Sequence, residues 1–486
     1  MDLLLNLAIW LPLAGAVLIA VLPGNADRSA RWIAAVISGV ALLLALALAW
    51  GYDPNAGVAS PLGLTSVPWI PQLGIGYVVG LDGLSLPMFV LNALLVFLAV
   101  LISWNTTLRP REYFALVLAL ETAVAGVFSA LDFILFFLFW ELELAPMFLL
   151  IGIWGGARRE YAAMKFILYT VAGSAFMLLG IFILYLASPA HTFDMLQLGS
   201  QRLAPAVQSL IWILLFIGFA VKVPIFPLHT WLPDAHTEAP TAISVLLAGV
   251  LLKMGAYGIL RANFTLLPDA THQFALLLGI LAVINIVYGA LVAMVQGDLK
   301  RVIANSSISH MGYVLLGASS LTAIGIQGAV FQMFTHGTIT GLLFIMVGLI
   351  YDRTHTRAIA DLGGLAARMP KIAAIFIVAA LASLGLPGLS GFVSEFLVFL
   401  GSFPVWGVQT ILGVFTIVLT AGYMLWVVER VLFGPERPEW AHLGDATGRE
   451  MFAVGVLVAV IVLIGVFPAV LGNVVIAGTT PIALRY

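Results

Sequence analysis

Long apolar runs separated by short polar segments make up nearly the whole chain. Most runs are close to the ~20 residues that a helix needs to cross the hydrocarbon core of a bilayer. They predict fourteen transmembrane helices, and hence an all-α polytopic membrane protein. The predicted helices span residues 3–22, 30–50, 80–104, 112–129, 132–154, 163–187, 206–232, 240–262, 272–296, 301–320, 324–351, 370–402, 405–433 and 451–477.

The lysines and arginines between these runs separate by side. If both termini lie outside, sixteen of the 21 basic residues fall on the inner side of the membrane. Only Arg202, Arg261 and Arg485 fall outside, whereas Lys222 and Lys253 lie within helices. Because short, positively charged loops tend to stay in the cytoplasm, this separation predicts a multi-pass protein of a bacterial plasma (inner) membrane with both termini on the outer side.

Two groups of five predicted helices repeat one another. Helices four to eight begin near Arg111, helices nine to thirteen begin near Thr271, and the fourth helix of each group is interrupted. The interruptions, at Pro224 and Pro387, are 163 residues apart, which matches the spacing of the group starts. Since five is an odd number, the second group must be inverted, a pattern that points to a transport site at the membrane midplane. The predicted units are 1–110 (three helices), 111–265 (first repeat), 270–433 (second repeat) and 450–486 (last helix).

The segment AVKVPIFPLH interrupts the first of these two helices. Pro224 has no N–H to donate to the carbonyl of Ala220, and the ring of Pro227 clashes with the carbonyl of Val223. The freed carbonyls lie beside Lys222 at membrane depth, where lipid cannot satisfy them. We therefore expect this backbone to face protein or a water-filled cavity.

Composition supports the membrane class and excludes several kinds of chemistry. Of the 486 residues, 62% are hydrophobic and only 9% are charged, whereas a soluble domain carries about a quarter charged residues. The chain has no cysteine, so it cannot itself form disulfides, thiolate zinc sites, iron–sulfur clusters or covalent c-type haem. No phosphate-cradling glycine loop is present. We expect the chain to lie in the lipid bilayer and not to bind nucleic acid.

Seven titratable side chains lie within the predicted helices at comparable depth. A charge at the centre of such a helix costs roughly 2.5–3.5 kcal/mol on insertion scales, so these residues are expected to have partners or a function. A proton bound at one member changes the pKa of its neighbours, and the row therefore predicts an ion or proton path parallel to the membrane. Its members are Glu141, Lys222, Lys253, His310, His336 and Glu395, with Glu121 as a possible further member.

Each position also has a simpler interpretation. Glu143 is two residues from Glu141 and therefore on nearly the opposite helix face, so we expect it to face a neighbouring helix or subunit. The two histidines could be packing residues or haem ligands, and Glu121 could be a structural partner of a nearby polar group. The two lysines are too far from helix ends to reach the interface easily, which favours a function for them.

Several segments together resemble the antiporter-like membrane subunits of proton-pumping NADH:quinone oxidoreductase (respiratory complex I), in particular the subunit M type, called subunit 4 in mitochondria. The resemblance covers predicted helices three to twelve. The segments are GLDGLSLPMFV (80–90), FFLFWELELAPMFLLIGIWGG (136–156), VKVPIFPLHTWLPDAHTEAPTAISVLLAGVLLKMGAYG (221–258), DLKRVIANSSISHMGYV (298–314) and GLPGLSGFVSEFLVFLGSF (385–403).

The resemblance implies roles for the buried residues. Glu141 and Lys222 match the carboxylate–lysine pair of the first half-channel, and Lys253 matches the central lysine. The two histidines match those along the hydrated axis, and Glu395 matches the terminal group on the second broken helix. Because the related subunits L and N place lysine there, the glutamate favours the M type. Glu143 departs from the family pattern, in which this position is usually apolar.

What the resemblance implies about function is a proton-translocating module within a larger redox enzyme. FMN, iron–sulfur clusters and quinone are expected in partner subunits. This chain itself is expected to carry out no redox chemistry and to bind no cofactor. The expected partners are the L-type and N-type membrane subunits and, indirectly, the hydrophilic redox arm. A subunit of a multisubunit cation/proton antiporter or of a membrane-bound hydrogenase remains an alternative, as does a scaffold that no longer pumps.

Overall fold

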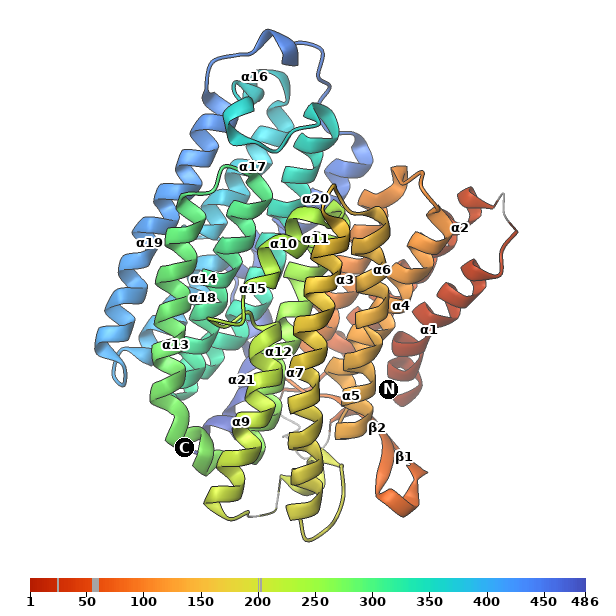
Figure 1. Cartoon of the computed structure of the whole chain (residues 1–486), viewed down its shortest axis with the longest axis vertical. Coiled ribbons are helices and arrows are strands. Elements are labelled where there is room, and N and C mark those ends of the chain that lie inside the picture. Colours follow the sequence, from red (N-terminus) through yellow and green to blue (C-terminus); the bar gives the residue numbers. More distant parts are fainter. Residues whose placement is uncertain (24–25, 55–60, 200, 202) are drawn as a thin grey trace.

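A bundle of helices makes up the computed structural model of the chain, which describes all residues except 24–25, 55–60, 200 and 202 (Figure 1). The predicted outer position of Arg202 thus lies outside the described residues. The first half contains α1 (Asp2–Ala20), α2 (Asp27–Trp50), α3 (Leu86–Ile102), α4 (Pro110–Ser129), α5 (Phe133–Leu142), α6 (Leu144–Trp154), α7 (Arg159–Ala187), α8 (Met195–Leu198), α9 (Pro205–Lys222), α10 (Trp231–Glu238), α11 (Thr241–Leu246) and α12 (Leu252–Gly258).

The second half is also helical. It contains α13 (Pro268–Met294), α14 (Leu299–Ser319), α15 (Ala323–Thr354), α16 (Leu365–Arg368), α17 (Pro370–Ser383), α18 (Ser390–Ser402), α19 (Gly407–Val428), α20 (Gly448–Val466) and α21 (Ala469–Ala483). Among the described residues, twelve helices are long and apolar enough to cross a membrane. The predicted helices 301–320 and 370–402 correspond to α14 and to the pair α17 and α18, which are not among those twelve, so the count of fourteen remains a prediction.

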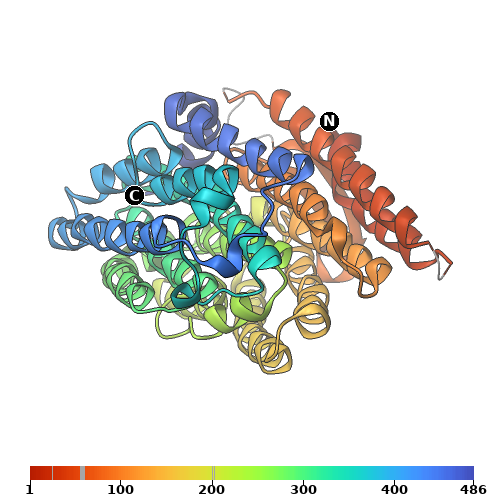
Figure 2. The same cartoon turned by 90° about the horizontal axis from the view of Figure 1, so that it is seen from above.

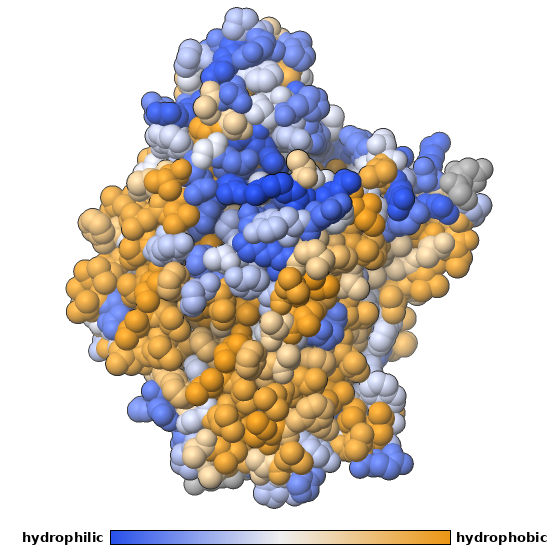
Figure 3. Space-filling view, in the orientation of Figure 1, coloured by the Kyte–Doolittle hydropathy of each residue, from blue (hydrophilic) through white to orange (hydrophobic). Residues whose placement is uncertain are grey.

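Apolar side chains cover most of the face shown in Figure 3, and polar residues gather toward its ends. Many large apolar residues are exposed, for example Leu168 at 63% and Phe415 at 64%. Such a surface is stable in lipid and would be unfavourable in water, because monomeric soluble proteins rarely expose large apolar patches. The fold is therefore that of a multi-pass membrane protein, as predicted.

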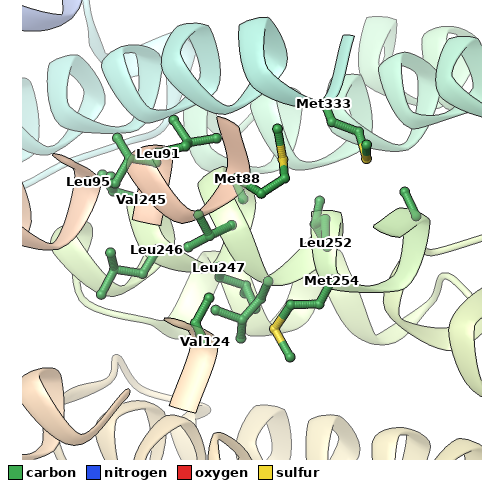
Figure 4. Packing of buried hydrophobic residues seen from close by; sticks show 14 of the residues in the cluster. Met88, Leu91, Leu95, Val124, Val245, Leu246, Leu247, Leu252, Met254 and Met333 are labelled. Atoms are coloured by element: carbon green, nitrogen blue, oxygen red, sulfur yellow. The ribbon is translucent and has the colours of Figure 1, made fainter. Parts of the chain in front are cut away.

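Two helical segments have central stretches that are completely buried inside the bundle. All of the most apolar stretch of α15 is buried, and so is that of the segment Thr241–Phe264, which comprises α11, α12 and two π-helical turns. Leucine and methionine side chains from these segments and from α3 pack together at the centre (Figure 4). The central helices carry Lys253 and His336, so the packing places titratable groups in the interior.

The first predicted break is present, because α9 ends at Lys222. The carbonyl of Ala220, which Pro224 cannot satisfy, accepts the N–H of Ile225 at 2.9 Å. The indole N–H of Trp231 donates to the carbonyl of Val221 at 2.9 Å. Protein groups thus satisfy the backbone freed by proline, as the absence of water in lipid requires.

Asn285 on α13 holds the same break from the opposite side. Its side-chain Oδ1 accepts the N–H of Phe226 at 2.8 Å, and its Nδ2 donates to the carbonyl of Pro224 at 3.1 Å. The residue is fully buried. The sequence gave no sign of this contact, because it joins groups about 60 residues apart along the chain.

The second predicted break lies between α17 and α18. Gly385 and Gly388 there have φ angles of +78° and +91°, which favour glycine. A Cβ atom at Gly385 would lie 2.7 Å from Oε2 of Glu395. Glycine at this position therefore allows the backbone turn and leaves space for the Glu395 carboxylate.

A β-hairpin in the segment 51–80 was not predicted. Strands β1 (Leu62–Ile70) and β2 (Ile75–Leu81) pair antiparallel. The predicted start of a helix at residue 80 is therefore wrong, because β2 continues to Leu81 and α3 begins only at Leu86. The side chain of Asp82 accepts the N–H groups of Leu84 and Ser85, which fixes the turn into α3.

Asp82 also forms an ion pair with Arg261, at 2.6 Å between Oδ2 and Nη2. Burial would raise the pKa of the Asp82 carboxyl, but the charge of Arg261 and the hydrogen bonds hold it below its usual range. This pair joins the start of α3 to the π-helical turn η4 (Ile259–Phe264), which follows α12.

Candidate functional site

Lys253 and His336 are in direct contact in the centre of the bundle. Nζ of Lys253 lies 2.6 Å from Nδ1 of His336, and it also donates to the carbonyl of Ala248. Lys253 is completely buried. The π-helical turn η3 (Leu247–Leu251) precedes it, and such turns, frequent at functional sites, alter the regular pattern of helix hydrogen bonds. The site thus begins with a lysine and a histidine at hydrogen-bond distance.

His310 and Glu395 form a second contact beside the first. Nδ1 of His310 lies 3.3 Å from Oε1 of Glu395, and Nε2 lies 3.3 Å from the hydroxyl of Ser383. The rings of His310 and His336 are 5.7 Å apart between centroids. Both His310 and Glu395 are 4% exposed. The structure therefore brings four of the predicted residues into one continuous buried row.

Three polar residues that were not among the predicted site residues support Glu395 and its helix. The hydroxyl of Ser394 donates to Oε1 of Gln332 at 2.5 Å and lies 2.9 Å from the hydroxyl of Thr335. Gln332 and Thr335, with His310, His336 and Glu395, line a cavity of about 10 Å³, which is about the volume that one water molecule needs. The cavity lies beside the two histidines and Glu395.

Lys222 has Glu143 as its direct ionic partner. Both side chains are buried, at 1% and 0% exposure. The ammonium group also lies 5.2 Å from the ring centre of Trp140 and 5.7 Å from that of Phe166. A charge in this position is stabilised by a carboxylate and two aromatic faces.

Glu143 thus faces a neighbouring helix, α9, and it takes the place beside Lys222 that was expected for Glu141. Helix α5 ends at Leu142 and α6 begins at Leu144. Pro146 removes the N–H that would bond to the carbonyl of Leu142. Glu143 itself keeps helical φ and ψ angles of −70° and −24°, so it lies on nearly the opposite face from Glu141, and that face points into the protein.

Glu141 lies next to this pair but is less buried. It interacts electrostatically with Lys222, and its buried Oε1 has no hydrogen-bond partner among the described residues. The flanking residues Leu138 and Leu142 are 43% and 41% exposed. Glu141 thus belongs to the outward-facing side of α5, whereas Glu143 is the direct contact of the lysine.

The two groups of residues are joined by close helix packing. A Cβ atom at Gly255 would lie 2.9 Å from Cβ of Lys222, so the end of α9 packs directly on α12 two residues beyond Lys253. Glu121 is separate from both groups. Its carboxylate is buried, and neither oxygen has a hydrogen-bond partner in the described part of the chain.

His236 and Lys300 are buried residues that were not predicted as site residues. The ring of His236 stacks on Phe344 with centroids 4.6 Å apart, and neither ring nitrogen has a partner among the described residues. His236 interacts electrostatically with Lys300 and with Lys253. Nζ of Lys300 donates to the carbonyl of Ala239 at 2.5 Å. The sequence shows these residues in the segments PDAHTEAP and DLKR, but it does not show that their side chains are buried.

A dense ion-pair cluster lies around the short helix α10. Asp234 contacts Lys165 at 2.8 Å, Arg301 at 3.3 Å and Arg158 at 3.7 Å. These contacts tie α10, which follows the break, to α7 and α14. Among the described residues, no three His, Cys, Asp or Glu side chains come together in an arrangement that could hold a metal ion.

Broken helices around a buried row of lysines, histidines and carboxylates define a membrane protein of the ion-translocating class. The chain belongs to the family described as "NADH:quinone oxidoreductase/Mrp antiporter, TM", which it matches over residues 130–420. It is 46% identical to NAD(P)H-quinone oxidoreductase chain 4 1 of Picosynechococcus, over 96% of this chain and 89% of that protein.

Solved structures show the same fold. A chain of respiratory complex I from Thermus thermophilus with bound NADH superposes with a TM-score of 0.90 at 31% identity, covering 98% of this chain and 99% of that one. A chain of the Mrp complex from Dietzia has a TM-score of 0.88 at 21% identity, with coverage of 99% and 97%. The second likeness shows the fold alone.

Proposed function

We propose that this chain is a proton-translocating membrane subunit of an NAD(P)H:quinone oxidoreductase of the complex I type. The names of its relatives and the full-length likeness to a chain of complex I support this assignment. The observation that carries it is the buried row from Lys253 through His336 and His310 to Glu395. Such a row has no use in a protein that only holds its neighbours together, because each member adds a cost of burial.

In this proposal, protons move along the row by short transfers. Lys253 and His336 share one proton across their 2.6 Å contact. The gap between the two histidine rings, 5.7 Å between centroids, suits transfer through a water in the adjoining cavity. His310 and Glu395 share the next proton across 3.3 Å.

The free energy needed to move a proton across the membrane is similar in size to the free energy of a modest pKa change. Moving one charge against 100 mV takes about 2.3 kcal/mol, and one pKa unit corresponds to about 1.4 kcal/mol. A change of under two pKa units at one member is therefore sufficient to drive the transfer of a proton to the next. The ion pair of Lys222 with Glu143, one helix away, supplies a charge whose opening or closing produces such a change at Lys253.

Access from the inner side is proposed to run through Lys300 and His236. Their electrostatic link to Lys253 supports this path. We further propose that both termini lie on the outer side of a bacterial plasma membrane, from the distribution of basic residues. FMN, iron–sulfur clusters and quinone belong in partner subunits, since this chain has no cysteine for a cluster. The membrane partners are then subunits of the L and N types, which connect it to the hydrophilic arm.

The alternative is a subunit of a multisubunit cation/proton antiporter, which the shared fold with a chain of the Mrp complex favours. Glu395 distinguishes the two, because the resemblance implies lysine at this position in the antiporter subunits. Substituting Glu395→Gln is expected to reduce the protons moved per electron in the reconstituted enzyme, whereas Glu395→Lys retains part of the activity. A normal ratio in the assembled glutamine variant would remove Glu395 from the path. Sodium dependence of transport would favour the antiporter alternative.

A further inference from the structure

An aromatic and cationic corner lies at the end of the bundle where α2, α4 and α20 begin. Figure 2 views the bundle from this end, with the N-terminal helices in red and the C-terminal segment in blue at one edge. The corner is formed by Arg31 and Trp32 on α2, Trp104 on the short helix η2 (Ser103–Asn105), and Arg449 and Phe452 on α20. None of these residues belongs to the buried row.

The two tryptophans and the two arginines are held in a fixed arrangement. Trp32 meets Trp104 edge to face, with ring centroids 5.0 Å apart. The guanidinium of Arg449 lies over the Trp104 ring at 5.4 Å, and its Nη2 is 3.2 Å from Oδ1 of Asn105. Nη2 of Arg31 donates to the carbonyl of Thr106 at 2.9 Å. Each guanidinium thus uses one nitrogen on a neutral oxygen and keeps further donors.

Neither arginine has a carboxylate partner among the described residues, and neither Nε has a hydrogen-bond partner there. Other arginines at this end are ion-paired. The paired ones include Arg158, Arg301, Arg353, Arg357, Arg368 and Arg437. Even Glu450, adjacent to Arg449, is paired with Arg353 instead. Within the described part of the chain, Arg31 and Arg449 are therefore not paired with a carboxylate.

Neighbouring residues increase this charge. Arg28 lies one helical turn before Arg31 on α2, and Arg109 and Arg111 flank the start of α4; none of the three has an ion pair within the described part of the chain. Nη1 of Arg111 donates to the carbonyl of Leu22, which places the start of α4 beside the connection from α1 to α2. The acids in the first turns of α2, α4 and α20 are Asp27, Glu112 and Glu450, three against the five arginines at these helix starts.

We propose that this corner binds the phosphate headgroup of an anionic phospholipid. Trp32 and Phe452 are 55% and 54% exposed, so they offer apolar surface to acyl chains beside the charged groups. Tryptophan is typical of the membrane–water interface, and basic pockets between membrane helices bind anionic headgroups. Arg31 and Arg449 contact the phosphate, and the paired tryptophans border the glycerol backbone. An acidic protein segment would satisfy the arginines but would leave Trp32 and Phe452 without a lipid-like partner.

Native mass spectrometry of the purified, intact complex tests this site. Dioleoyl phosphatidylglycerol is titrated against wild type, Arg31→Gln, Arg449→Gln and the double variant, with dioleoyl phosphatidylcholine as the neutral probe. Each arginine contributes about fivefold in affinity for the anionic lipid, from ~1 kcal/mol per basic residue near an anionic surface. The neutral lipid is expected to bind equally to all variants. Arg368→Gln is the matched control, because this arginine is exposed and already paired with Glu436.

Two further measurements distinguish a lipid headgroup from free phosphate as the bound anion. Excess inorganic phosphate is expected not to displace the lipid, and Trp32→Ala is expected to weaken lipid binding while leaving both arginines in place. Unchanged phosphatidylglycerol affinity in the single and double arginine variants would overturn the proposal. Displacement by phosphate, or loss of a protein subunit with lipid affinity unchanged, would overturn it as well.

Discussion

At the scale of single residues, the two buried lysines of the site differ in the groups that they contact. Lys253 contacts His336 and a carbonyl, while Lys222 contacts Glu143 and two aromatic rings. These two lysines therefore have different surroundings, one neutral and one acidic. A carboxylate stabilises the charged form of a lysine beside it, so Lys222 is suited to holding its proton, whereas the described contacts of Lys253 include no carboxylate.

The contact of Lys222 leads to a prediction about the two carboxylates of α5 and α6. Glu143→Gln is expected to reduce the protons moved per electron more strongly than Glu141→Gln, because it leaves Lys222 without its direct counter-ion. Breaking a buried ion pair typically costs roughly 3–5 kcal/mol. The ratio of protons to electrons, measured in proteoliposomes and normalised to assembled complex, checks the order of the two effects. A larger loss in Glu141→Gln would restore Glu141 as the partner of Lys222.

At the scale of elements, the interrupted helices determine where the site residues lie. The chain showed the two main breaks because proline lacks an N–H, a local effect that holds in any fold. The spacing argument put Glu141 and Glu143 on opposite helix faces, but spacing alone could not show that the face of Glu143 is the one in contact with Lys222. Asn285 could not be predicted either, because its partners come from a different helix and only packing brings them together.

Asn285 provides the test at this scale. Asn285→Leu removes two hydrogen bonds and leaves the Phe226 N–H and the Pro224 carbonyl buried without a partner. Each unsatisfied group is expected to cost about 1–3 kcal/mol, so the variant should unfold at a clearly lower temperature in detergent. Gln273→Leu on the same helix is the control, because its contact with Ser209 is exposed. Equal melting temperatures for the two variants would show that the break does not depend on Asn285.

At the scale of the whole molecule, local sequence patterns predicted the class of protein and part of its architecture. The membrane class, the helical bundle and the two main breaks followed from apolar runs and prolines. Four of the predicted site residues meet in one row, but their distances depend on packing that no local pattern encodes. The hairpin of β1 and β2 was missed because its residues read as a loop rich in proline and glycine.

The prediction at the scale of the whole molecule concerns its orientation in the membrane, with both termini on the outer side. The natural sequence has no cysteine, so a single introduced cysteine reports its own side. Ala441→Cys, at an exposed position before α20, should react with an impermeant maleimide only from the cytoplasm. Ala190→Cys, at an exposed position after α7, should react only from outside. The reverse pattern would invert the proposed topology and move the aromatic and cationic corner to the outer leaflet.

The number of protons moved per electron in a Lys253→Met complex tests the central claim most directly. Lys253 is completely buried and starts the row, and methionine keeps much of its length without a titratable group. We expect a lower ratio than in wild type at equal complex content, with Lys371→Met, an exposed lysine at the start of α17, unchanged. A wild-type ratio in the assembled Lys253→Met enzyme would contradict the assignment of the buried row as the proton path.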